Sequence, residues 1–183
     1  EGGRTEVECR ACGRGVSVGG VAPAGGGRSG GQRAPGVGRA RGGRCSGGVR
    51  VFGARGLVCG GGGEIGTSET YEDVVLELEW EGSEGGNSGI FYRAIEQPDQ
   101  PIYWSAPEMQ VLDNANHPDA DRGENGNRKA GSLYDLIPAD PQTFSGHGEW
   151  QDVMIVVEGG HVEHWLNGQK VLEYETWTPG WYR

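Results

Sequence analysis

Apolar and polar residues alternate along much of the second half of the chain. Within residues 71–80, every second side chain from Val74 onward is apolar, whereas Glu77 and Glu79 fall at the positions between. The apolar positions are Val74, Leu76, Leu78 and Trp80. A period of two is typical of a half-buried β-strand. The pattern therefore predicts a strand that places one face in a core.

Similar runs recur downstream, separated by turn residues. We predict strands over residues 87–96, 106–114 and 131–137, and then a meander of strands over 151–157, 161–166 and 171–175. Asn167-Gly168 separates the last two runs, and Asn-Gly between alternating runs is the strongest short hairpin signal. No stretch keeps a helical period of 3.6 residues. The expected fold is an antiparallel all-β sandwich or barrel.

Residues 1–63 have a different composition from the rest of the chain. They hold 23 of the 37 glycines, ten arginines and one leucine, and their net charge is +7 against −17 for the remainder. So little apolar surface cannot offset the chain entropy that is lost on folding. We therefore predict a disordered, low-complexity Gly/Arg-rich segment over residues 1–56 and a folded domain over residues 57–183.

Three interpretations of the Gly/Arg-rich segment are open. A basic tail can bind nucleic acid, but such tails usually interleave aromatic residues, and only Phe52 is present. A flexible linker is the second interpretation. The third, which we favour, is out-of-frame sequence, because GC-rich DNA yields these residue types when it is translated in the wrong frame. We predict no nucleic-acid partner.

Candidate metal ligands are sparse in the sequence. Cys9 and Cys12 have zinc-ligand spacing, but no second pair follows them at the spacing of a finger. The acidic loop 119–124 beside His117 offers oxygen ligands without a recognised metal-binding spacing. No apolar run is long enough to span a bilayer. We predict no metal, no cofactor and no membrane span, and the sequence leaves the oligomeric state open.

Several motifs in residues 57–183 resemble those of one known family. The strings NSGIFYR at 87–93 and PEMQVLDN at 107–114 are similar to the two signature strands of the 3-keto-disaccharide hydrolase domain family. GSLYD at 131–135, GEW at 148–150 and HVEHWLNG at 161–168 match further motifs in the same order. The family pattern also has an opening strand and a closing motif that this sequence lacks. The resemblance therefore implies a domain that is incomplete at both ends.

The resemblance implies a concanavalin A-like jelly roll of two antiparallel sheets. It implies a hydrolase that cleaves glycosidic bonds of 3-keto-glycosides or 3-keto-disaccharides, by removing the proton on carbon 2 and then eliminating and hydrating. Many members are exported from bacterial cells, so a periplasmic or secreted location is expected. A lectin-like module that binds carbohydrate without cleaving it is the alternative, because the same fold hosts both functions.

Two carboxylates are the predicted catalytic residues. Glu108 and Gln110 lie two positions apart and share one face of a strand, with apolar residues on the other. From the residues alone, an ordinary solvated outer face is the favoured explanation of that pattern, whereas the resemblance favours a face that binds a sugar. Asp113 ends the same run and is predicted to act as a base, to orient the ligand or to cap the next loop.

Four residues are predicted to bind the substrate: Asn87, Arg93, Gln110 and Trp104. Arg93 is suited to a sugar hydroxyl, the keto oxygen or a carboxylate such as Glu108, and a structural ion pair is the alternative. Asn87 follows a glycine turn that it could instead stabilise. Trp104 and the adjacent Tyr103 form either an aromatic platform or a loop anchor. His164 is expected to be a hydrogen-bonded histidine of the core or surface.

Overall fold

The computed structural model describes residues 71–95 and 100–181 in full, together with the backbone of four short strands upstream. These four strands are β1 (Val7–Cys9), β2 (Gly48–Phe52), β3 (Leu57–Cys59) and β4 (Ile65–Thr67). The remaining strands are β5 (Val74–Glu81), β6 (Asn87–Phe91), β7 (Glu108–Leu112), β8 (Trp150–Glu158), β9 (His161–Leu166) and β10 (Gln169–Glu175). Two short 3₁₀ helices, η1 (Ile102–Trp104) and η2 (Pro118–Asp121), lie in the connections.

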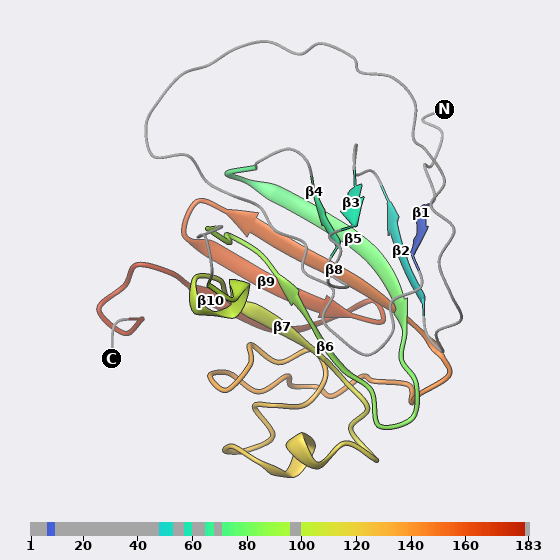
Figure 1. Cartoon of the computed structure of the whole chain (residues 1–183). Coiled ribbons are helices and arrows are strands. Elements are labelled where there is room, and N and C mark those ends of the chain that lie inside the picture. Colours follow the sequence, from blue (N-terminus) through green and yellow to red (C-terminus); the bar gives the residue numbers. More distant parts are fainter. Residues whose placement is uncertain are drawn as a thin grey trace.

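The larger layer is a six-stranded antiparallel sheet in the order β1-β2-β5-β8-β9-β10 (Figure 1). Its register pairs Leu78 with Val153 and Ile155 with His164 across neighbouring strands. Buried and accessible residues alternate along β5, β8 and β9. One face of this sheet is therefore apolar, as expected from the period of two.

The second layer consists of β6 and β7, which pair antiparallel and lie against the apolar face of the large sheet. Ile90, Met109 and Val111 from this pair join Leu78 and Ile155 in one core cluster. The long connection after β7 gathers beside β6 and β7, as the yellow and orange loops of Figure 1 show. The fold is an all-β antiparallel sandwich, which confirms the jelly-roll class expected from the sequence.

The strand predictions hold with two exceptions. The strand predicted over residues 87–96 ends at Phe91, because Arg93 has a φ of 52°, which an extended strand cannot accommodate. Residues 131–137 do not form a strand but a tight turn, in which the amide groups of Leu136 and Ile137 both donate to the carbonyl of Leu133. Gly131 and Asp135 have positive φ values of 86° and 62°, which an extended strand cannot accommodate. Only isolated bridges join Leu133 to Met109 and Ile137.

Most of the segment predicted to be disordered, residues 1–56, lies outside the described residues. Within it the structure describes only the backbone of β1 and β2, which pair with each other and extend the large sheet beyond β5. The boundary at residue 57 remains a prediction. Among the described residues, no helix is long and apolar enough to cross a membrane.

Candidate functional site

The β6–β7 pair presents two chemically different faces. Cross-strand partners share a face, and the register pairs Phe91 with Glu108 and Gly89 with Gln110. Ile90 and Met109, at the alternate positions, point into the core. The opposite face therefore carries Glu108 and Gln110 outward, which confirms that these two residues share a face.

A cavity of about 760 Å³ opens on this outward face. That volume falls within the usual range for sites that bind small ligands. The lining combines polar and aromatic side chains from β6, β7, η1 and the turn after residue 131. Its residues include Asn87, Gly89, Phe91, Tyr103, Glu108, Gln110 and Tyr134.

Glu108 lines the cavity with a carboxyl whose pKa is strongly shifted. Burial, together with the smaller effect of the negative charge of Asp119, raises the pKa of its carboxyl from 4.5 to about 7. A carboxyl with this pKa is divided between its acid and base forms at neutral pH. Such a group is suited to accept a proton from a substrate and to return it.

Gly89 provides the space in which the Glu108 side chain lies. A Cβ atom added at Gly89 would lie 2.6 Å from Cδ of Glu108 and would overlap Oε1. Because the overlapping atoms belong to the end of a flexible side chain, a larger residue at position 89 would displace the carboxylate. The glycine of the NSGIFYR string therefore leaves room for the Glu108 carboxylate, a role that the sequence alone did not reveal.

Two side-chain amides, those of Asn87 and Gln110, line the same cavity as this carboxyl. Gln110 is only 1% exposed, and its Oε1 accepts a hydrogen bond from the amide of Val111 at 3.1 Å. Its Nε2 donates to Oδ1 of Asn87 at 3.4 Å. Both predicted binding residues, Asn87 and Gln110, thus lie in the same cavity as Glu108, and the Asn87 amide N–H groups remain suited to a ligand oxygen.

A network of side chains under one wall of the cavity was missed by the sequence analysis. Arg128 donates to Asp119 at 3.1 Å and, through Nε, to Asp135 at 2.7 Å. Tyr134, which lines the cavity, donates to Asp119 at 2.8 Å. Burial works to raise the pKa of Asp119, but these hydrogen bonds and the Arg128 charge lower it overall. Asp119 therefore stays ionised and supplies the charge that acts on Glu108.

Asp113 lies outside the cavity lining. Its carboxylate accepts hydrogen bonds from the amides of Gly85 and Ala115 and from the side chain of Asn116. Its Oδ2 also lies 3.3 Å from Nδ1 of His147. Although burial opposes ionisation, these partners lower the pKa of Asp113. The contacts place it as the anchor of the loops that flank β6 and β7, away from Glu108.

Arg93 and Trp104 also lie outside the cavity lining. Arg93 follows β6 with a φ of 52°, and its guanidinium donates to the carbonyl of Gly159 in the β8–β9 turn rather than to Glu108. Trp104 is 69% exposed at the end of η1, whereas the preceding Tyr103 lines the cavity. The aromatic side chain that this loop contributes to the cavity is therefore that of Tyr103, and not that of the predicted Trp104.

His164 is a residue of the core. It is completely buried, and its Nε2 lies 2.7 Å from the hydroxyl of Tyr92 while Nδ1 lies 3.0 Å from the carbonyl of Gly131. The Tyr92 hydroxyl also contacts that of Tyr174 at 2.6 Å. Burial lowers the pKa of His164 to about 4. A neutral imidazole ring satisfies the hydrogen bonds on both sides of His164, because Nδ1 donates to the carbonyl of Gly131 and Nε2 accepts from the hydroxyl of Tyr92.

Comparison with solved structures places the sandwich among glycosyl-hydrolase-like folds. A protein from Parabacteroides distasonis described as a glycosyl hydrolase superposes with a TM-score of 0.58 at 29% identity, over 64% of this chain and 55% of that one. A second protein from the same strain, with the same description, gives a TM-score of 0.55 at 24% identity, over 69% and 59% of the two chains. The second likeness concerns the fold alone.

The chain belongs to the family of 3-keto-alpha-glucoside-1,2-lyase-like domains, whose model matches residues 28–183. A 3-keto-disaccharide hydrolase of Bacteroides thetaiotaomicron is 48% identical over 131 residues, which cover 67% of this chain and 45% of the relative. The chain therefore spans less than half the length of this curated relative. The family expected from the signature strings is confirmed.

Proposed function

We propose that the domain cleaves glycosidic bonds of 3-keto-glycosides, with Glu108 as the base that removes the proton on carbon 2. The observation that carries the proposal is a carboxyl with a pKa of about 7 inside a cavity of ligand size. The name of the Bacteroides relative and the family description support the substrate class. A periplasmic or secreted location accompanies this proposal on the strength of the resemblance alone.

The chemistry follows from the ketone. The carbonyl at carbon 3 acidifies the hydrogen on carbon 2, so Glu108 takes up that proton and the electron pair moves into an enolate. The enolate then reforms the ketone and expels the group on carbon 1, whose oxygen takes a proton from water. The hydroxide left from that water adds to carbon 1 of the resulting double bond, and Glu108 returns a proton to carbon 2, which gives the free 3-keto-sugar and regenerates the carboxylate. In this proposal the amide N–H groups of Asn87, which lines the same cavity, donate to the enolate oxygen.

A comparison of a 3-keto-glucoside with the unoxidised glucoside tests this mechanism directly. We expect the protein to cleave methyl 3-keto-α-glucoside and to leave methyl α-glucoside intact, because only the ketone makes carbon 2 acidic. In deuterated water the product should carry deuterium at carbon 2, as read by NMR. A glycosidase that uses an oxocarbenium-like transition state would favour the unoxidised sugar. Tight binding of the keto-sugar without cleavage would instead support the lectin-like alternative.

The space beside Gly89 gives a second test. We expect Gly89→Ala to lower turnover of the keto-glucoside at least about tenfold, because the added methyl group displaces the Glu108 carboxylate and misplaced groups lose rate steeply. The free energy of unfolding should change by less than about 1 kcal/mol, since Ala is tolerated in strands at least as well as Gly. Turnover and urea denaturation of the same preparation measure both. Unchanged turnover would show that the carboxylate has no role at this place.

A further inference from the structure

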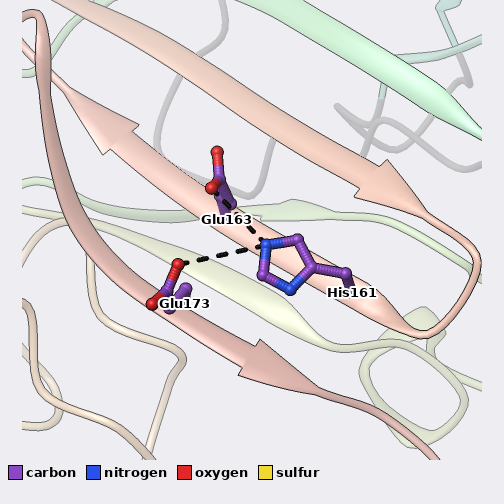
Figure 2. A group of neighbouring side chains, drawn as sticks. All are labelled: His161, Glu163 and Glu173. Atoms are coloured by element: carbon purple, nitrogen blue, oxygen red, sulfur yellow. Dashed lines mark hydrogen bonds and ion pairs between the residues drawn. The ribbon is translucent and has the colours of Figure 1, made fainter.

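Four titratable side chains form a square on the outward face of β9 and β10. The register pairs His161 with Glu175 and Glu163 with Glu173. Their neighbours Val162 and His164 are buried, so the square lies on the side of the large sheet that faces away from the core. Figure 2 shows His161 and Glu163 projecting from one strand toward Glu173 on the next. This site is on the opposite layer of the sandwich from the Glu108 cavity.

The three side chains of Figure 2 have metal-binding spacing. Nε2 of His161 lies 3.4 Å from Oε1 of Glu163 and 4.0 Å from Oε2 of Glu173, and the three ligand atoms lie within 4.8 Å of one another. Zinc bonds of about 2.0–2.2 Å to nitrogen and oxygen place ligand atoms about 3.3–3.6 Å apart in a tetrahedron. Small rotations of these side chains, which are half-buried at His161 and Glu163 and exposed at Glu173, are therefore enough to close the set around one ion.

The imidazole is oriented for such a role by a residue outside that set. Nδ1 of His161 lies 2.7 Å from Oε1 of Glu175. A ring N–H that donates to a carboxylate is the usual second contact of a metal-binding histidine, since it fixes the tautomer and directs the other nitrogen to the ion. Nε2 then faces two carboxylate oxygens, which is unfavourable unless a proton or a cation lies between them.

Lys170 already partly fills this need for a cation. Its Nζ lies 3.1 Å from Oε1 of Glu163 and 2.5 Å from Oε2 of Glu173, the same two oxygens that face the imidazole. The lysine side chain is accessible to solvent and can move aside. The indole N–H of Trp165 holds the other oxygen of Glu163 at 2.8 Å, which leaves Oε1 directed at the centre of the set.

We propose that His161, Glu163 and Glu173 bind one divalent transition-metal ion of the Zn²⁺ class, with water completing the coordination and Lys170 as the competing internal cation. The mixed nitrogen and carboxylate donors suit Zn²⁺ and Co²⁺ better than Ca²⁺ or Mg²⁺, which favour all-oxygen sites. Because the ligands come from adjacent strands, the ion would clamp the β9–β10 hairpin and stabilise the folded state.

Cobalt provides the test. EDTA-treated protein at pH 8, where protons compete least for His161, is titrated with Co²⁺ alone. We expect one equivalent with the visible absorption of four-coordinate cobalt and no sulfur charge-transfer band in the near ultraviolet, which separates this site from cysteine ligation. Zn²⁺ should displace the cobalt and raise the melting temperature. His161→Gln and Glu173→Gln should each lose this equivalent, while Glu77→Gln on the exposed face of β5 should keep it.

The lysine distinguishes a metal site from an ordinary ion-pair network. Lys170→Gln should tighten Zn²⁺ binding about tenfold, because the ion no longer has to displace a bound ammonium group. A network that merely pairs Lys170 with glutamates would lose stability in this variant and gain no affinity for zinc. Identical cobalt spectra in the wild type and His161→Gln, or no visible cobalt band in the wild type, would overturn the proposal.

Discussion

Glu108→Gln should lower turnover of methyl 3-keto-α-glucoside by about 10²–10⁴-fold, the range that general acid–base groups contribute. Gln keeps the shape of the side chain and removes the group that takes the proton. Binding of the keto-sugar should change far less than turnover, because the amide still fills the cavity. In the wild type, kcat/KM should rise with pH and level off above about 7, where the Glu108 carboxyl is ionised.

The same substitution should stabilise the protein at alkaline pH. The folded pKa of Glu108 lies above its unfolded value, so the folded state binds the extra proton and stability falls as pH rises from 4.5 through 7. At pH 8 the Gln variant avoids a partly buried charge, and we expect a gain of about 1–3 kcal/mol in urea denaturation. A variant that is both fully active and no more stable would remove Glu108 from the mechanism.

Asp113→Asn is the matched comparison. This carboxylate anchors the flanking loops through Gly85, Ala115 and Asn116. Its replacement should therefore lower stability at neutral pH, and any loss of turnover should follow the loss of folded protein. A loss of turnover in fully folded Asp113→Asn would restore the catalytic role that the sequence analysis gave to this residue.

The strands could be predicted because their pattern is local. Alternation along β5 and β9 reports which side chains are buried, and Asn167-Gly168 adopts the two positive φ values, 53° and 76°, that a two-residue hairpin turn needs. The same local signal placed Glu108 and Gln110 on one face. Within a strand, sequence spacing is enough to fix direction.

The rest of the site depends on loops, whose course is set by distant contacts. Asp113 and Arg93 lie at the ends of the signature strands, where alternation stops, and hydrogen bonds to Gly85 and Gly159 direct their side chains elsewhere. Asp119 and Tyr134 meet beside the cavity although 15 residues separate them. The only sequence signal for Tyr134 was its place in the GSLYD string, which assigned it no role.

The largest expected effect on stability belongs to His164. Its folded pKa of about 4 lies below the ordinary value of 6.5, so the unfolded chain binds more protons between these two pH values. Stability is therefore full above pH 6.5 and is lost as pH falls toward 4, by about 3 kcal/mol over the whole window. Protonation would also turn Nε2 into a donor, and Tyr92 would then have to reverse its hydrogen bonds.

Glu108 hides this loss in the wild type. As pH falls from 7 toward 4.5, Glu108 takes up a proton in the folded state first, which increases the free energy of unfolding. Over the same range His164 takes up a proton in the unfolded state first, which decreases it. We expect a nearly flat stability profile between pH 6.5 and 5 in the wild type. In Glu108→Gln the profile should fall by about 2 kcal/mol over the same interval, measured by urea denaturation at fixed ionic strength. Stopping at pH 5 avoids protonation of Asp113, Asp119 and Glu163, whose pKa values are lowered.

A double variant identifies the titrating group. His164→Gln should be less stable than the wild type at pH 7, because it disturbs the buried hydrogen bonds that join His164 to the hydroxyl of Tyr92 and the carbonyl of Gly131. In Glu108→Gln/His164→Gln the fall between pH 6.5 and 5 should disappear, since neither group remains to titrate. If the Glu108→Gln profile stays flat, or if the fall persists in the double variant, another group controls stability in this range and the buried neutral histidine is excluded as its cause.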